Sequence, residues 1–215
     1  MKHLMPWRRA ALRAVLMLTL AAVFQPASAD AGAFSAADLK RMSTFVSNFV
    51  EAHFPDFDMQ KGEAPANSAL IRFGVSHNDH NNFKSRIKRC EQENCKFSLL
   101  IDAKFVAESV KKYFGLDVQH RSVSGDDDQP PFHFDGKSYH FDASDVPSGG
   151  DPGQYAKVTR ATKEGSIVRM TGDIYEEDNS GDPPEIIATF VVTAKPHKWN
   201  GKNTWAILSL KREYR

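Results

Sequence analysis

Two histidines lie on either side of an Asp-Gly pair, where a hairpin would bring their side chains onto one face of a sheet. The pair sits between alternating segments in residues 132–141, which predicts a two-residue type I′ turn. In that register His133 and His140 are diagonal neighbours about 7 Å apart, close enough to shuttle a proton or bridge a metal. They are candidate catalytic residues, and the alternative is a solvated face opposite a core of four aromatic side chains. These are Phe132, Phe134, Tyr139 and Phe141.

Two arginines are predicted to face each other across the next hairpin. If Glu164-Gly165 forms the tight turn, Arg160 lies directly opposite Arg169. Like charges in that position destabilise a sheet unless an acidic residue or an anionic ligand lies between them. We therefore expect Arg160, Arg169 and Tyr155 of the same hairpin to bind a ligand. The alternatives are that salt screens these charges on an exposed surface, or that the strand register differs.

The first 29 residues have the pattern of a secretory signal peptide. Basic residues precede an apolar run over residues 14–24, and Ala27-Ser28-Ala29 supplies the small residues of a cleavage site. The alternative, an uncleaved anchor, would need a longer run, because about 20 residues span a bilayer. We expect residues 30–215 to be exported to the periplasm or the extracellular space as one domain, with no stable membrane insertion.

The net charge of +1 combines two unlike parts of the chain. The first 29 residues contain four basic residues and no acidic ones, which leaves residues 30–215 with a small excess of acidic residues. Nucleic-acid binding needs a basic stripe, and docking on anionic lipid needs a basic cluster. The charge therefore argues against both partners and leaves a small molecule or an envelope protein as the expected partner.

Both cysteines, Cys90 and Cys95, fall in the part expected to be exported, where disulfides form and persist. A disulfide between them closes a short loop and would stabilise the fold by about 2 kcal/mol. The alternative is a zinc site with His77 and His80, but the spacing H-x2-H…C-x4-C matches no closed structural site. Redox chemistry of the thioredoxin type uses C-x-x-C instead. We expect a disulfide and no bound metal.

Several common catalytic and binding motifs are absent from the sequence. It contains no G-x-S-x-G elbow, no H-E-x-x-H, no Walker loop and no Rossmann glycine set. The acidic segments 126–128 and 176–185 could offer oxygen ligands to calcium, but they lack the residue order of an EF-hand. We therefore expect solvated acidic loops and no cofactor, and the absence of these motifs favours a non-enzymatic protein over an enzyme without excluding the enzyme.

Two helices are indicated by capping residues and by the spacing of apolar residues. Ser35, with Asp38 three residues later, has the form of a capping box, and apolar residues then recur at i, i+3 and i+4 up to the break at Pro55. A second helix is expected over residues 102–114, with Asp102 as its N-cap. Gly115 ends that helix in a left-handed conformation.

The remaining chain is predicted to form a loop over residues 55–67, a strand at Ala69–Val75, and about six strands after the second helix. No helix separates the later strands, so the sheet should be mostly antiparallel. Two of them, residues 186–194 and 205–210, are apolar on both faces and need a cover on each. We expect a helix on one face, and a second helix or the partner of a homodimer on the other.

These elements define an α+β fold in which N-terminal helices pack on a curved, mostly antiparallel sheet of about six strands. This order of elements resembles the cystatin-like and NTF2-like superfold, in which a curved sheet wraps a helix and often leaves a cone-shaped cavity. The superfold hosts both enzymes and binding modules, so the resemblance leaves the function open.

We expect an exported non-enzymatic module that binds a small ligand or an envelope protein. One alternative is an NTF2-like hydrolase or isomerase, with His133 or His140 as the base and Arg160 and Arg169 holding an anion. Another is a structural envelope protein that dimerises through its sheet face.

Overall fold

The computed structural model describes residues 34–81, 85–91, 95, 97–125, 131–142, 153–177 and 181–215. All of them belong to one unit of the fold, Ala31–Arg215. The expected signal peptide and the acidic run 126–128 lie outside the described residues.

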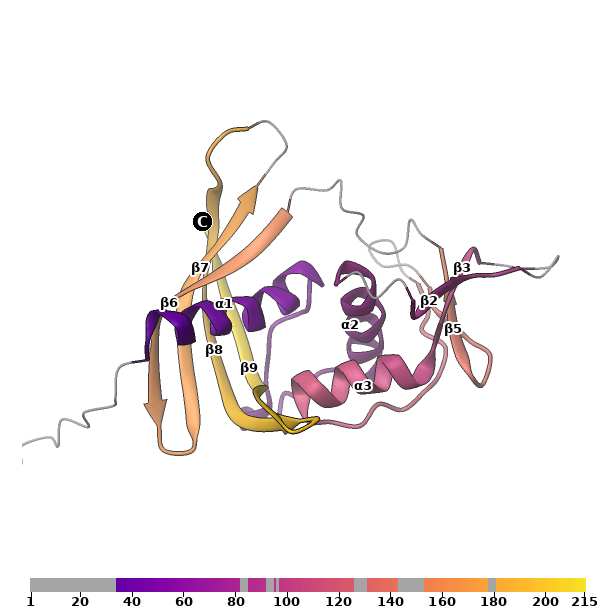
Figure 1. The fold of residues 1–215 in the computed structure, drawn as a ribbon, viewed down its shortest axis with the longest axis horizontal. Coiled ribbons are helices and arrows are strands. Elements are labelled where there is room, and N and C mark those ends of the chain that lie inside the picture. Colours follow the sequence, from indigo (N-terminus) through magenta and orange to yellow (C-terminus); the bar gives the residue numbers. More distant parts are fainter. Residues whose placement is uncertain are drawn as a thin grey trace, which may run out of the picture. The chain divides into compact units, whose positions relative to one another are not determined.

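The described residues contain three α-helices and two antiparallel sheets, which confirms the α+β class (Figure 1). The helices are α1 (Ala36–Glu51), α2 (Asn67–His80) and α3 (Ala103–Phe114). The five-stranded sheet has the order β1 (Phe57–Asp58), β9 (Lys202–Tyr214), β8 (Glu185–Trp199), β7 (Ile167–Glu177) and β6 (Gly153–Glu164). The four-stranded sheet has the order β2 (Ile87–Arg89), β3 (Leu99–Asp102), β5 (Ser138–Phe141) and β4 (His133–Phe134). The strands therefore divide between two sheets, where the sequence indicated one.

Helices α1 and α3 begin and end where the sequence predicted. The Ser35 hydroxyl accepts a hydrogen bond from the Asp38 N–H at 3.1 Å, and the Asp38 carboxylate accepts one from the Ser35 N–H at 3.1 Å. The carboxylate of Asp102 accepts a hydrogen bond from the Lys104 N–H at 3.1 Å at the start of α3. Gly115 ends that helix with a φ of +69°. Both capping predictions are therefore confirmed.

The segment Ala69–Val75, expected to be a strand, lies in the middle of α2 instead. Leu70 and Phe73 belong to the core beneath the five-stranded sheet, whereas Ile71 and Val75 belong to the core of the four-stranded sheet. A helix that is buried on two sides has a nearly continuous apolar sequence, and a short run of that kind does not distinguish helix from strand. The strand prediction was wrong for this reason.

The two cores differ in size and in the residues that fill them. The larger core lies between the inner face of the five-stranded sheet and the helices, and rings from several elements meet at its centre. These are Phe45, Phe49, Phe54, Phe73, Tyr113 and Phe114. The ring of Phe49 lies 5.2 Å from that of Phe73 and 5.4 Å from that of Phe114, measured between centroids. The smaller core contains Phe132, Tyr139 and Phe141, as the hairpin pattern predicted.

Helix α1 lies along β6, at the edge of the five-stranded sheet (Figure 1). The N–H groups of Ala156 and Val158 point away from β7 and donate to the hydroxyls of Ser47 and Ser43, each at 2.9 Å. The register of β6 against β7 shifts just after Val158, where Gly172 is its partner. A Cβ at Gly172 would come within 2.0 Å of the Lys157 carbonyl oxygen, so the close approach of the two backbones requires glycine here.

The segment 55–67, predicted as a loop, contains a short strand at the edge of the five-stranded sheet and a 3-10 helix beside it. Phe57 and Asp58 of β1 pair with Leu210 and Ser209 of β9. A short 3-10 helix, η1 (Met59–Lys61), follows directly and contacts β9. A two-residue strand is too short to show a sequence period, so only tertiary pairing reveals it.

Candidate functional site

The face of the five-stranded sheet that is turned away from α1 and α3 carries mostly polar side chains. We call it the outer face, and strand alternation assigns to it Lys157, Arg160 and Thr162 of β6, Arg169, Thr171 and Asp173 of β7, Thr189, Val191 and Thr193 of β8, and Ser209, Lys211 and Glu213 of β9. The expectation that β8 and β9 are apolar on both faces is therefore wrong for their outer side. Helices α1, α2 and α3 pack on the inner face.

A groove of about 380 Å³ crosses the outer face where β7, β8 and β9 approach η1. Its lining combines cationic, acidic and hydroxyl side chains from elements that are distant in sequence. Those used below are Asp58, Lys61, Arg169, Thr193, Ser209 and Lys211. Small-ligand sites are concavities in which a few polar groups converge, and this groove is more polar than most of them.

One wall of the groove is fixed by Asp58, which is buried. Its Oδ2 lies 3.5 Å from the Nζ of Lys211 and 4.0 Å from the Nζ of Lys61. The hydroxyls of Thr193 and Ser209, on neighbouring strands, lie 2.6 Å apart and share a hydrogen bond. Both lysines are thus paired with one carboxylate, while the hydroxyls form a polar floor beside them.

The predicted pairing of Arg160 directly opposite Arg169 is wrong. The turn is formed by Gly165-Ser166, so Arg169 faces Thr162 and Arg160 faces Thr171. A type I′ turn at Glu164-Gly165 would need a positive φ at the glutamate, whereas in the structure Gly165 alone adopts one, at +63°. Arg160 and Arg169 remain diagonal neighbours on the outer face, about 7–8 Å apart by sheet geometry.

Both arginines lack an acidic partner among the described residues. No carboxylate oxygen there lies within 4 Å of either guanidinium, and both residues are exposed. The nearest cross-strand partners carry hydroxyls instead, on Thr162, Thr171 and Thr193. Two cations beside neutral hydrogen-bonding groups form a surface to which an anion can bind.

Tyr155, the third predicted ligand-binding residue, lies on the same face of β6 as Arg160. Its ring stacks on that of Tyr175 in β7, with centroids 5.3 Å apart and an interplanar angle of 9°. The Nζ of Lys157 lies 5.9 Å from the Tyr175 ring centroid. The structure therefore places the three predicted residues on one face, but the Lys157–Asp173 pair separates the stacked tyrosines from the arginines.

The two candidate histidines lie on the four-stranded sheet and line no part of the groove. His133 and His140 are directly paired, whereas the sequence predicted diagonal neighbours. The Asp135 carboxylate accepts hydrogen bonds from the N–H groups of Lys137 and Ser138, and Gly136, not Asp135, takes the positive φ, at +97°. The alternative in which a histidine and the arginine pair form one active site is not supported, because they lie on different sheets.

Cys90 and Cys95 form the predicted disulfide, with an S–S distance of 2.04 Å. Their thiolates are therefore not available for the alternative zinc site with His77 and His80. Among the described residues, no three histidine, cysteine, aspartate or glutamate side chains converge as a metal site.

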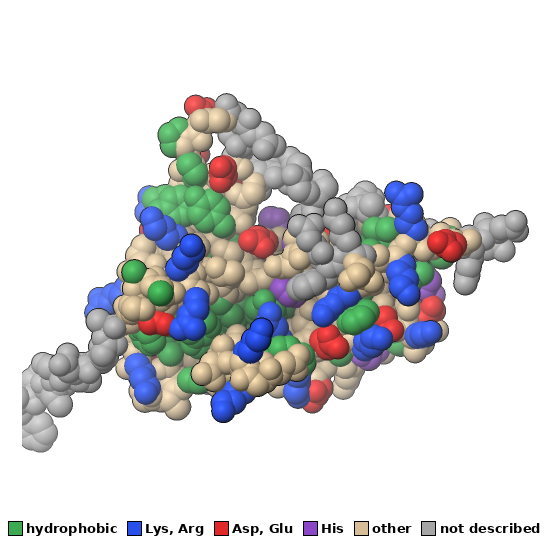
Figure 2. Space-filling model, viewed as in Figure 1, with side chains coloured by type: hydrophobic (Ala, Val, Ile, Leu, Met, Phe, Trp, Pro, Cys, Tyr) green, Lys and Arg blue, Asp and Glu red, His purple; other side chains and the backbone are tan. Residues whose placement is uncertain are grey.

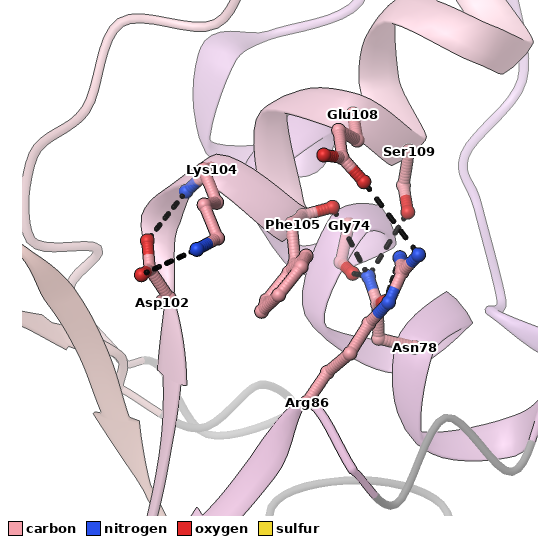
Figure 3. Close-up of polar contacts among 8 residues, drawn as sticks. All are labelled: Gly74, Asn78, Arg86, Asp102, Lys104, Phe105, Glu108 and Ser109. Carbon is pink, nitrogen blue, oxygen red and sulfur yellow. Dashed lines mark hydrogen bonds and ion pairs between the residues drawn. The ribbon is translucent and has the colours of Figure 1, made fainter. Parts of the chain in front are cut away.

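A polar cluster between α2 and α3 was missed by the sequence reasoning. Asn78 is fully buried, and its side-chain amide donates to the carbonyl of Gly74 at 2.7 Å and to the Ser109 hydroxyl at 2.9 Å (Figure 3). Its Oδ1 accepts a hydrogen bond from Arg86 at 3.0 Å, and Arg86 also pairs with Glu108 at 3.6 Å. The amide and the ion pair join α2 to α3 and to the segment that leads into β2.

Titratable groups with shifted pKa values gather at the same junction of the helices. Burial, together with the charges of Lys112 and Arg86, lowers the pKa of His77 to about 3. Burial also lowers the pKa of Lys112 and raises that of Glu51. The imidazole of His77 is thus neutral at pH 7, stacked on Phe73 with centroids 5.6 Å apart.

This cluster was hidden by the wrong strand prediction at Ala69–Val75. On a helix, His77 and Asn81 are four residues apart and share one face, and their side chains meet at 3.0 Å. The polar residues 76–81, which directly follow the apolar run, were the feature of the sequence that could have indicated it. Because its groups satisfy one another within the fold, we interpret the cluster as structural.

No family model, curated protein or solved structure matches the chain. The resemblance to cystatin-like and NTF2-like proteins therefore stays a prediction. Among the described residues, no helix is both long enough and apolar enough to span a bilayer. On the face shown in Figure 2, basic and acidic side chains are interspersed and form no continuous basic stripe.

Proposed function

We propose that the protein is an exported, non-enzymatic binding module that holds an anionic group of a small ligand or an envelope protein on its outer face. The observation that carries the proposal is Arg169, which lines the groove with no acidic partner among the described residues and has Arg160 as its diagonal neighbour.

The chemistry of the groove favours binding over catalysis. Guanidinium groups bind carboxylate, sulfate or phosphate oxygens through paired hydrogen bonds, and threonine and serine hydroxyls add further donors. No histidine lines the groove, and its buried acid Asp58 is engaged by two lysines. The groove therefore offers several cationic and hydroxyl donors for an anion, and its other carboxylate, Glu213, is exposed on β9.

Two observations support export. The disulfide is typical of oxidising compartments, and the first 29 residues have the charge and hydropathy pattern of a signal peptide. The periplasm or the extracellular space is therefore the location that we propose.

The proposal is tested by NMR titration of the protein with sodium phosphate, sodium sulfate and sodium succinate at constant ionic strength. We expect saturable shifts of backbone amides in β7 and β8, and a loss of affinity of about tenfold or more in Arg169→Gln. The matched control is Arg89→Gln, which removes an exposed arginine from the four-stranded sheet. The proposal is wrong if no anion gives a saturable shift, or if both variants weaken binding equally.

Sedimentation velocity over a range of concentrations tests the competing use of this face. A dimer that Arg169→Gln or Val191→Asp dissociates would place a second copy of the chain on the outer face and would replace ligand binding with the structural alternative. A monomer at all concentrations leaves the face open to a ligand.

A further inference from the structure

We propose that His133 and His140, oriented by Asp135, form a binding site for a divalent transition-metal ion such as Zn²⁺ or Cu²⁺ on the four-stranded sheet. The two residues are directly opposite each other on β4 and β5, and their ring centroids lie 6.1 Å apart. The site is separate from the proposed anion groove, which lies on the other sheet.

The ring separation suits two nitrogen ligands of a single ion. A Zn–N bond is about 2.0–2.1 Å long, so two imidazoles on one ion have centroids roughly 5–6 Å apart. The observed distance lies at the upper end of that span, and small rotations of the two side chains would close it. The rings are inclined by 56°, so they are not stacked face to face.

Asp135 supplies the carboxylate that commonly orients a metal-binding histidine. Its Oδ2 lies 2.7 Å from Nε2 of His140, which leaves the lone pair of Nδ1 for a metal. Its other oxygen accepts hydrogen bonds from the N–H groups of Lys137 and Ser138, at 2.8 and 2.7 Å.

His133 completes the pair from an accessible position. It is exposed, and its ring lies against that of Phe97, with centroids 6.4 Å apart and an interplanar angle of 16°. The hairpin fixes His140 while His133 can turn toward an incoming ion. Two protein nitrogens leave the remaining coordination positions to water or to a ligand group, which makes the site open and exchangeable.

This donor set also defines which ions should bind. Imidazole nitrogen is a good ligand for Zn²⁺ and Cu²⁺, with Cu²⁺ bound more tightly at equal geometry, whereas Mg²⁺ and Ca²⁺ prefer oxygen ligands. We therefore expect binding of Cu²⁺ and Zn²⁺ and none of Mg²⁺.

The test is isothermal titration of ZnCl₂, with MgCl₂ as the ion control, into protein purified without a polyhistidine tag. All samples contain the exported chain, residues 30–215, which lacks the histidine at position 3. We expect one zinc site, a loss of affinity of tenfold or more in His133→Ala and in His140→Ala, and a 10- to 100-fold loss in Asp135→Asn. The matched control His53→Asn removes an exposed histidine elsewhere and should bind as the parent does.

A second measurement locates the ion without relying on variants that could perturb the hairpin. Addition of substoichiometric Cu²⁺ should broaden the NMR signals of residues 131–142 first. Zinc affinity unchanged in both histidine variants, or broadening centred on α2 near His77 and His80, would overturn the assignment.

Discussion

The two sheets of this protein are stabilised in different ways. Strands β6 to β9 have 11 to 15 residues and cover an extensive aromatic core, whereas β2 to β5 have two to four residues and a small one. The short strands are held by local links: the disulfide, the Asp135 turn, and Asp142, which accepts hydrogen bonds from the N–H and hydroxyl of Ser98 at 2.8 and 2.9 Å. Where the strands are short and bury little apolar surface, the disulfide and side-chain hydrogen bonds to the backbone supply the stabilisation instead.

Helices α2 and α3 belong to both regions and connect them. They approach so closely that a Cβ at Gly74 would come within 2.6 Å of Val106 Cγ1, and the Asn78 amide joins them nearby. The following predictions test how far the two regions depend on each other, beginning with the largest expected effect.

Phe49→Ala should reduce the free energy of unfolding by about 3–5 kcal/mol, because it empties the centre of the larger core. Phe141→Ala should act mainly on the smaller core and open the four-stranded sheet locally. Urea unfolding and amide hydrogen exchange distinguish the two effects. Equal global losses, with no local loss of protection in β2 to β5, would show that both cores unfold as one cooperative unit.

Acidification should destabilise the junction between the two regions through His77. Its pKa is about 3 in the folded protein and about 6.5 when unfolded, so the unfolded state binds more protons between those values. Stability should fall as the pH decreases below 6.5, by up to about 1.4 kcal/mol per pH unit. Urea unfolding from pH 8 to pH 4.5 measures this slope.

His77→Gln is the variant that isolates the contribution of this imidazole. It should flatten the difference between pH 7 and pH 5, because glutamine does not titrate. Glu51, whose pKa is raised by burial, contributes with the opposite sign and is retained in both proteins. An unchanged slope in the variant would assign the acid sensitivity to other groups.

Removal of the disulfide, by Cys90→Ser with Cys95→Ser, should cost about 2 kcal/mol, as expected for a short closed loop. The loss should be confined to the four-stranded sheet, since the disulfide joins residues beside β2 and β3. Hydrogen exchange should show reduced protection in β2, β3 and β5 and unchanged protection in β7 and β8. A uniform loss across both sheets would contradict the distinction between them.

Ser35→Ala should cost about 1 kcal/mol, because it removes the hydroxyl of the capping box at the start of α1. Thr44→Ala, on the exposed side of the same helix, is the matched control and should change stability by less than about 0.5 kcal/mol. Thermal unfolding by circular dichroism measures both. Similar values for the two variants would mean that the cap contributes little.

The turns show how far the sequence could predict register. Asn200-Gly201 forms a two-residue turn with positive φ at both residues, 48° and 76°, as the Asn-Gly rule anticipates. At Asp135-Gly136 and Glu164-Gly165 only the glycine takes a positive φ, so each turn begins one residue later than predicted. The faces of the strands were nevertheless correct, because this shift moves the pairing by two residues and preserves the alternation.

Helices α1 and α3 could be predicted from their capping residues, although α3 contributes to both cores, whereas α2 could not. The capping residues Ser35 and Asp102 mark where α1 and α3 begin, and the regular spacing of apolar residues in α1 marks its buried side. Helix α2 has two apolar faces, so its sequence shows no helical period. The polar contacts of His77 and Asn78 could not be predicted for the same reason. The arginines of the candidate site were found by residue type, but their lack of acidic partners and the groove around Arg169 depend on pairing between distant strands.

The hydroxyls of Ser43 and Ser47 on α1 have a consequence for how copies of this chain meet one another. An unpaired strand edge is a template on which a strand of another molecule can add, and it is the usual starting point of aggregation. At β6 the N–H groups of Ala156 and Val158 are already occupied by the serine hydroxyls of α1. Protection against strand addition is thus part of how the first helix docks.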